Sequence, residues 1–459
     1  MDFSNANVAL WQPIVQIGII AGLLLGANII RRKIGVIKKS LIPTAVLAGF
    51  ILLIVRTAGV IKMNTNFLET LTYHALALGF IALSLRVPEK VQESGKGLAV
   101  KNGALIVSTY LVQAIIGLGI SIGLAYTFMP DFFKASGILL AMGYGQGPGQ
   151  ANNVGVTYEG FGFIGGQSFG LAIAAAGYLC ACLVGVVYLN ICNRKCKLNR
   201  NTPNTIISGS VTVEEFQNEN EIPIAESVDK LSVQAALIVL VYLITYLVTW
   251  GLCSLLDFIS SGLAGAVSSL LRGFNFIIGS LVATIFRSVM SGLRKTNIMK
   301  RQYQNNYLLS RISGLAFDVM IICGIASIEI NDLKGLWVPF ILMSVLGGVV
   351  TFAYLKFMCK KIYPKYEYEA FFSMFGMLTG TISSGVLLLR EIDPHFKTPA
   401  SNNLITGSSM GIIFGAPILL MVSLAAKSTL MVFVTFGLVV LYLAILLFIM
   451  FKVGNKKNK

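Results

Sequence analysis

Charged residues are scarce in this chain of 459 residues. Asp, Glu, Lys and Arg together make up 12% of the sequence, against 55% hydrophobic residues and a mean hydropathy of +0.77. Soluble domains contain about 25% charged residues. Because so few charges cannot cover the surface of a globule in water, the composition excludes most soluble enzymes. It predicts a polytopic membrane protein, and one built of helices, since a backbone in lipid must satisfy its own hydrogen bonds.

Residues for several kinds of chemistry are also few. The two histidines, His74 and His395, leave little for a His-rich metal site. The sequence contains no G-x-x-x-x-G-K-[ST] phosphate-binding loop, which makes ATP-driven transport by this chain alone unexpected. The seven cysteines are odd in number and lie mainly in apolar stretches, unlike a secreted disulfide framework. We therefore expect a protein that is not an enzyme, binds no cofactor and holds no metal beyond a coupling ion.

The excess of basic residues suits the loops of a membrane protein. The chain has 36 Lys and Arg against 20 Asp and Glu, a net charge of +16 that in a soluble protein would suggest a nucleic-acid partner. Cytoplasmic loops are enriched in Lys and Arg, and most of these residues fall on one side if the N-terminus is outside and the C-terminus is cytoplasmic. This pattern predicts a multi-pass protein of the cell membrane whose partner is the lipid bilayer, not a nucleic acid.

Eleven apolar stretches are candidate membrane-spanning helices. A helix needs about 20 residues to cross roughly 30 Å of hydrocarbon. The expected spans are 8–30, 41–59, 68–85, 102–129, 161–190, 231–256, 274–291, 308–329, 335–355, 403–425 and 428–451.

Two further segments, at about 135–158 and 369–390, differ from lipid-facing helices. The first is rich in glycine and contains Pro148, so we expect that 143–153 cannot continue as a helix. The second contains Gly376, Gly380 and Gly385 among Thr and Ser. Irregular backbone at membrane depth is tolerated only inside protein or along a water-filled cavity. Each segment is therefore predicted to be a re-entrant hairpin.

The chain divides into two similar halves. Residues 164–170 and 405–411 each follow a broken segment and share Gly, Ser and Gly in register. Five spans precede a polar stretch, so the second half enters the membrane with the opposite orientation. We expect a first repeat over 1–191, a flexible cytoplasmic linker over 192–230, a second repeat over 231–427, and an extra helix with a basic tail over 428–459. Two inverted five-helix repeats with discontinuous segments are typical of secondary transporters.

The candidate binding residues come mainly from the two broken segments. Exposed carbonyls and hydroxyls suit a desolvated Na⁺, whereas free N–H groups and helix N-termini suit an anion. The predicted substrate-binding residues are Gln146, Gln150, Asn152, Asn153, Thr379, Thr381, Ser383, Ser384 and Arg390. The predicted Na⁺-binding residues are Gly145, Gly147, Ser168, Asp318 and Ser409. We expect the Gly147 and Thr381 regions to approach within about one substrate's width, on the order of 10 Å, near the midplane.

Several of these residues have alternative interpretations. Asp318, inside a span, is a cation ligand, a proton carrier or the partner of an arginine. Arg390 either reaches a substrate carboxylate or anchors the chain at the cytoplasmic surface. For Arg56 and Arg287 we favour snorkelling to the interface, and for His74 a hydrogen bond within the helices.

The serines of the two halves also match a hydrolase pattern. Ser168 and Ser409 each lie in a Gly-x-Ser-x-Gly sequence, the pattern of a hydrolase nucleophile elbow. Here it lies in apolar helices without a nearby histidine. Close helix packing is therefore the better interpretation, with both hydroxyls available to the site.

Three stretches resemble the bacterial sodium/glutamate symporters, as a divergent branch. They are Lys38-Lys39-Ser40-Leu41-Ile42-Pro43, Gly145-Gln146-Gly147-Pro148-Gly149-Gln150-Ala151 and the segment 376–394. The resemblance covers about 30–430 and implies two inverted five-helix halves, each with a re-entrant hairpin, and an oligomer, most simply a homodimer. It also implies Na⁺-coupled uptake of an acidic amino acid. Gln146 and Pro148 depart from the His and Thr of the better-known hairpin, and the eleventh span exceeds the family's ten.

Together these observations predict a secondary active transporter that moves Na⁺ and glutamate, or a related organic anion, into the cell. The alternatives are a cation/proton antiporter with Asp318 as the carrier, and a passive ion channel.

Overall fold

The computed structural model describes most of the chain. The described residues are 2–4, 7–35, 37, 42–87, 96–196, 230–259, 268, 271–272, 275–393 and 398–452. The predicted linker at 192–230 lies outside them over 197–229, as do His395, Lys38 and Lys39.

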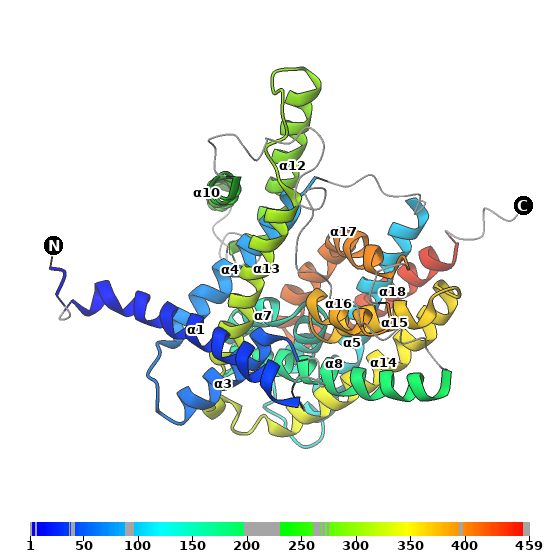
Figure 1. Cartoon of the computed structure of the whole chain (residues 1–459). Coiled ribbons are helices and arrows are strands. Elements are labelled where there is room, and N and C mark those ends of the chain that lie inside the picture. The colour runs from blue at the N-terminus through cyan, green and yellow to red at the C-terminus, as the bar shows by residue number, and fades with distance from the viewer. Residues whose placement is uncertain are drawn as a thin grey trace, which may run out of the picture. The chain divides into compact units, whose positions relative to one another are not determined.

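The secondary-structure elements of the described residues are all helices, and none is a strand (Figure 1). The longer helices are α1 (Val8–Lys33), α3 (Thr44–Thr57), α4 (Thr65–Leu85), α5 (Lys96–Ala125), α8 (Gly166–Cys196), α10 (Lys230–Ile259), α12 (Asn275–Lys295), α13 (Asn306–Ala326), α14 (Trp337–Ile362), α17 (Ala400–Ala426) and α18 (Thr429–Lys452). Between α5 and α8 lie η1 (Lys134–Gly137), α6 (Ile138–Leu140), η2 (Ala141–Gln146) and α7 (Pro148–Glu159). The short η3 (Ile330–Leu333) precedes α14, and α15 (Glu367–Thr379) and α16 (Ile382–Arg390) precede α17.

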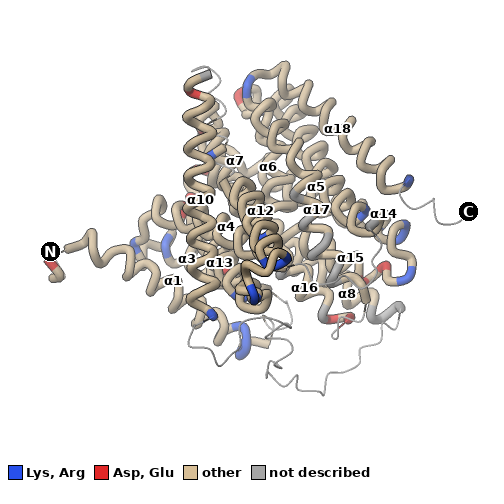
Figure 2. The backbone as a smooth tube through the Cα atoms, turned by 90° about the horizontal axis from the view of Figure 1, so that it is seen from above, with Lys and Arg blue, Asp and Glu red and all other residues tan. Residues whose placement is uncertain are grey.

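The predicted all-α polytopic membrane architecture is confirmed at this level. Nine of the described helices are long and apolar enough to cross a membrane, and two shorter apolar stretches, Thr44–Thr57 and Ile413–Ala426, coincide with the other two predicted spans. Lysine, arginine and acidic residues lie mostly near helix ends, and the helices carry few charges along their length (Figure 2). Large apolar side chains such as Trp250 and Leu441 are exposed, as lipid-facing residues should be.

The described chain forms two compact units that cut across the predicted sequence halves. The first unit combines residues 1–69, 93–201 and 321–459, and the second combines 70–92 and 202–320. Each unit therefore contains segments from before and after the linker. The inverted repeat and the re-entry into a membrane remain predictions.

In the first unit, α5 is the central helix. It packs against α14, α17 and α18, while α8 packs against α7 and α15. Both broken segments belong to this unit, so its helices position the candidate site.

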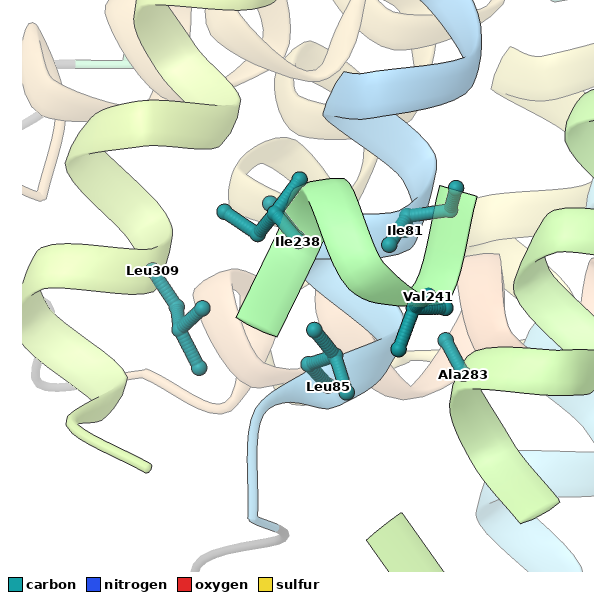
Figure 3. Packing of buried hydrophobic residues seen from close by; sticks show 7 residues of the cluster. Ile81, Leu85, Ile238, Val241, Ala283 and Leu309 are labelled. Carbon is teal, nitrogen blue, oxygen red and sulfur yellow. The ribbon is translucent and has the colours of Figure 1, made fainter. Parts of the chain in front are cut away.

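In the second unit, apolar side chains join four helices. Ile81 and Leu85 of α4, Val241 of α10, Ala283 of α12 and Leu309 of α13 pack in one buried cluster (Figure 3). Burying such side chains is worth about 1.5–3 kcal/mol each when they are large. This cluster fixes the position of α12 within the unit.

Candidate functional site

The first broken segment is interrupted at a single residue. The π-helix η2 ends at Gln146, Gly147 has φ of 88° and ψ of −176°, and α7 begins with Pro148 at its first position. Only glycine adopts that backbone conformation readily, and proline is tolerated at a helix start because its missing N–H needs no partner there. The expectation that a helix cannot continue through 143–153 is therefore confirmed at Gly147, although the residues on both sides of it are helical. A six-residue π-helix is itself unusual and often marks a functional site.

The second broken segment is interrupted at two residues. Helix α15 ends at Thr379, Gly380 has φ of −139° and ψ of −107°, and Thr381 is extended before α16 begins at Ile382. The two helices then pack back on each other, since a β-carbon placed on Gly376 would lie 2.8 Å from Gly385. This segment is a helical hairpin whose tip is Gly380 and Thr381.

The two breaks lie directly against each other. A β-carbon placed on Gly147 would lie 3.7 Å from the carbonyl oxygen of Gly380 and 3.8 Å from Cγ2 of Thr381. The hydroxyl oxygen of Tyr178, on α8, would be 3.8 Å from the same position. The expected approach of the Gly147 and Thr381 regions is therefore confirmed.

This contact brings opposite helix ends together. The N-termini of α7 and α16 begin at the two breaks, and neither has a side-chain hydrogen bond capping it. A helix N-terminus carries a partial positive charge and free N–H groups. The C-terminal ends of η2 and α15 meet at the same place with their carbonyl oxygens. The junction therefore has donors for an anion and acceptors for a cation side by side.

Several buried oxygens around the breaks have no hydrogen-bond partner among the residues that the structure describes. They are Gln113 Oε1, Gln150 Oε1, Thr381 Oγ1 and Ser384 Oγ. Buried polar groups nearly always find a partner, in the protein or in water. Four such oxygens near one pair of breaks are a sign of a site for a polar ligand.

Gln113 of α5 connects the two segments. Its Nε2 donates to the carbonyl oxygen of Leu378 at 2.8 Å and to Oγ1 of Thr351 at 3.0 Å. Its Oε1 would lie 2.8 Å from a β-carbon placed on Gly145. Gln113 is not among the residues predicted from the sequence, because a lone glutamine in a long apolar helix carries no motif.

The other predicted substrate-binding residues differ in their surroundings. Thr379 Oγ1 donates to Phe375 O within its own helix, and Asn152 Oδ1 accepts from Gln167 Nε2 at 2.8 Å. Gln146 is half-buried beside the break, and Asn153 is buried in α7. The side chains of Ser383, Arg390 and Ser409 lie outside the described residues, although their backbones are in α16 and α17.

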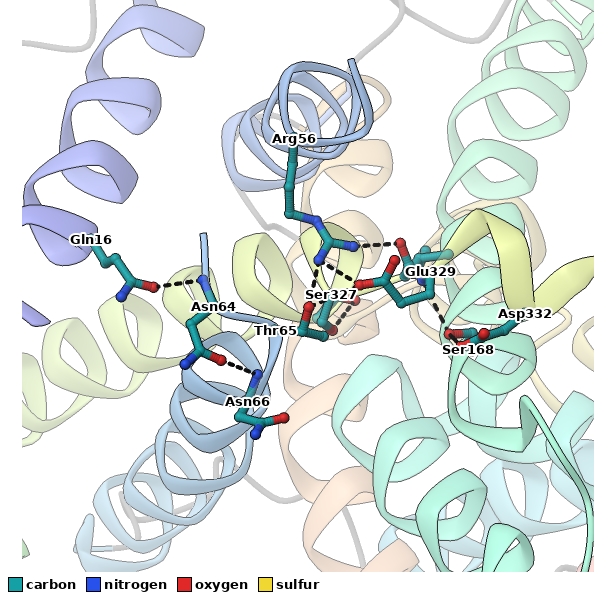
Figure 4. A network of polar contacts seen from close by, with 11 residues as sticks. Gln16, Arg56, Asn64, Thr65, Asn66, Ser168, Ser327, Glu329 and Asp332 are labelled. Atoms are coloured by element: carbon teal, nitrogen blue, oxygen red, sulfur yellow. Dashed lines mark hydrogen bonds and ion pairs between the residues drawn. The ribbon is translucent and has the colours of Figure 1, made fainter. Parts of the chain in front are cut away.

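Ser168, predicted to bind Na⁺, lies in a different polar network (Figure 4). Its Oγ accepts the N–H of Glu329 at 3.1 Å and donates to Asp332 Oδ2 at 3.1 Å. It is nine residues before Gly177, whose β-carbon position overlaps the carbonyl of Thr379, so it is roughly 13 Å along α8 from the breaks. The structure does not bring Ser168 together with Gly145 and Gly147.

Arg56 belongs to this network, and its snorkelling to the interface remains a prediction. Arg56 Nη1 lies 2.8 Å from Glu329 Oε1 and 2.7 Å from Thr65 Oγ1, and its Nη2 donates to Ile328 O (Figure 4). Arg287 of the second unit donates to the carbonyls of Ser84 and Arg86, at the C-terminal end of α4. Both arginines therefore connect helices.

Two remaining residues belong to the second unit. His74 Nδ1 lies 2.6 Å from Tyr242 Oη, which confirms the expected hydrogen bond within the helices. Asp318 is half-buried in α13, and no ion pair links it to another described residue. The third interpretation of Asp318, an arginine partner, therefore finds no support in the described part of the chain.

Comparisons with known proteins do not name a family. No family model matches this chain, and no curated protein matches it. The resemblance to sodium/glutamate symporters thus rests on the sequence motifs alone.

Proposed function

We propose that this chain is a secondary active transporter that couples the entry of Na⁺ to uptake of a small organic anion, with glutamate the first candidate. The main observation that supports this proposal is the contact between the two broken helical segments at Gly147 and Thr381. Two uncapped helix N-termini there favour an anion, and the adjacent carbonyls and unpartnered oxygens favour a hard monovalent cation.

The charge balance of the tips supports co-transport. Residues 135–158 and 370–389 contain no charged side chain. A carboxylate substrate entering such a site alone would be costly, because isolated charges are poorly solvated away from water. Binding Na⁺ beside it offsets that cost, so each ligand raises the affinity for the other.

The test is uptake of labelled glutamate by the purified chain in proteoliposomes. We expect accumulation when Na⁺ is higher outside, and little when K⁺ replaces it. Thr381→Val removes an unpartnered hydroxyl at the junction and should reduce uptake at least tenfold. Thr435→Val removes an unpartnered buried hydroxyl of α18 and is the matched control, with uptake unchanged.

Other outcomes would identify a different function. Uptake insensitive to Na⁺ in well-folded protein would contradict symport. Cation flux driven by a pH gradient would favour the antiporter with Asp318 as the carrier. The half-buried carboxylate of Asp318, which forms no ion pair with another described residue, supports this candidate. Non-saturating downhill ion flux would indicate a channel.

A further inference from the structure

A basic cavity of about 400 Å³ lies at the end of α12. It is bounded by the last turns of that helix and the loop leading to α13. Its described lining residues include Arg287, Arg294, Lys295 and Arg301, and none of them is Asp or Glu. Four cations around one cavity, with no carboxylate among its described lining residues, favour an anionic ligand.

The walls of this cavity are held by specific hydrogen bonds. Arg294 Nη1 donates to Gln302 Oε1 at 2.8 Å, and Gln302 Nε2 donates to the carbonyl of Gln304 at 2.8 Å. Gln302 and Gln304 are both buried, so the loop is folded against the helix. Lys295 also lines the cavity, is exposed, and takes no part in these bonds.

An apolar stripe on α12 leads to the cavity. Leu281, Ile285 and Val289 are 55%, 63% and 55% exposed and recur every four residues, so they share one side of the helix. Ser288 and Gly292 continue that side and line the cavity. An amphiphile with its chains along the stripe would have its head among the four cations.

We propose that this cavity binds the head group of an anionic phospholipid, with the acyl chains along Leu281, Ile285 and Val289. Basic pockets at the cytoplasmic ends of membrane helices are suited to anionic lipid head groups. A soluble phosphate ion would bind the same cationic side chains but would leave the apolar stripe of Leu281, Ile285 and Val289 uncovered. The site lies within the second unit and does not depend on what the breaks of the first unit bind.

The test measures lipid binding by the full chain. Purified protein in neutral detergent is titrated with dioleoylphosphatidylglycerol, and bound lipid is counted by native mass spectrometry, with dioleoylphosphatidylcholine in a parallel titration. We expect saturable binding of phosphatidylglycerol only. Lys295→Gln with Arg301→Gln should weaken it about 30-fold, because each basic residue near an anionic lipid surface contributes roughly fivefold.

Two controls separate a local effect from loss of fold or of net charge. Lys295→Arg with Arg301→Lys keeps both charges and should keep phosphatidylglycerol binding. Lys360→Gln with Lys361→Gln removes two charges from the end of α14, outside the cavity lining, and should have no effect. Equal affinity in the wild type and the Lys295/Arg301 glutamine variant would overturn the proposal. Competition by inorganic phosphate at concentrations that match the lipid would overturn the lipid assignment in favour of a free anion.

Discussion

Gly147 lies directly against Thr381, where the first broken helical segment meets the tip of the second. The β-carbon position of Gly147 is 3.8 Å from Cγ2 of Thr381, an ordinary van der Waals distance. Space is therefore not what requires glycine at this position. The backbone conformation at Gly147 requires glycine, because φ of 88° with ψ of −176° is almost restricted to glycine.

Gly147→Ala should therefore impair the site through its backbone. We expect a loss of roughly 1–3 kcal/mol in stability, or a shift of the break, and a large fall in uptake. The matched control is Gly59→Ala, which also has a positive φ, of 74°, with nothing within 4 Å of its β-carbon position. Thermal unfolding and uptake are measured together. If both variants lose stability but both keep uptake, the break at Gly147 is not part of the transport site.

Gln113 should be essential to the junction of the two segments. Gln113→Leu removes the hydrogen bonds to Leu378 O and Thr351 Oγ1 and leaves a buried carbonyl without its donor, at a cost of about 1–3 kcal/mol. Thr351→Val removes only one of these bonds and is the comparison. We expect a lower melting temperature and weaker substrate binding for Gln113→Leu than for Thr351→Val. Equal effects would show that the bond to the α15 carbonyl contributes nothing.

The pair of Arg56 and Glu329 should be energetically coupled. Arg56 is 9% exposed and Glu329 42%, so solvent partly screens the pair and we expect a coupling energy of about 1 kcal/mol. A double-mutant cycle with Arg56→Met and Glu329→Gln measures it from unfolding. Arg31→Met in place of Arg56→Met is the control and should give no coupling, since Arg31 bonds Thr44 instead. A coupling energy of zero in the first cycle would show that the ion pair contributes nothing to the free energy of unfolding.

Asp318→Asn separates two roles of the intramembrane carboxylate. If Asp318 ligates or carries a cation, the apparent affinity for Na⁺ or the pH dependence of transport should shift about tenfold while the fold is kept, because ligand charge sets cation affinity. Asp257→Asn, at an exposed position of α10, is the control. Unchanged ion dependence in well-folded Asp318→Asn protein would remove Asp318 from the transport site.

Glu159 should make stability depend on pH. Partial burial raises the pKa of its carboxyl group, although the backbone N–H of Gln167 donates to it at 3.0 Å. A folded pKa above the unfolded value of about 4.3 means that stability is fully present below that value and falls as pH rises through the folded pKa. Glu159→Gln should therefore raise the melting temperature at pH 7 and have little effect near pH 4. A lower melting temperature for Glu159→Gln than for the wild type at pH 7 would mean that the hydrogen bond from Gln167 lowers the pKa of Glu159 more than burial raises it.

The sequence by itself determined the class of this protein. Scarce charges in long apolar runs require helices in lipid, and glycine with proline around Gly147, or glycine with threonine at Gly380, interrupts those helices for local steric reasons. Local rules overestimated the length of the first interruption, because they could not show that Gly147 alone absorbs the turn. Local rules also do not predict which residues form hydrogen bonds or ion pairs with one another.

Only the tertiary structure decided which distant groups meet. Gln113 became part of the site because α5 lies beside both breaks, and Ser168 was placed with Glu329 because the chain before α14 folds onto the start of α8. Arg56 and Arg287 found carboxylate or carbonyl partners that no local pattern encodes. The physical reason is that hydrogen bonds and ion pairs act over about 3 Å, and residues far apart in sequence come that close only once the helices have packed.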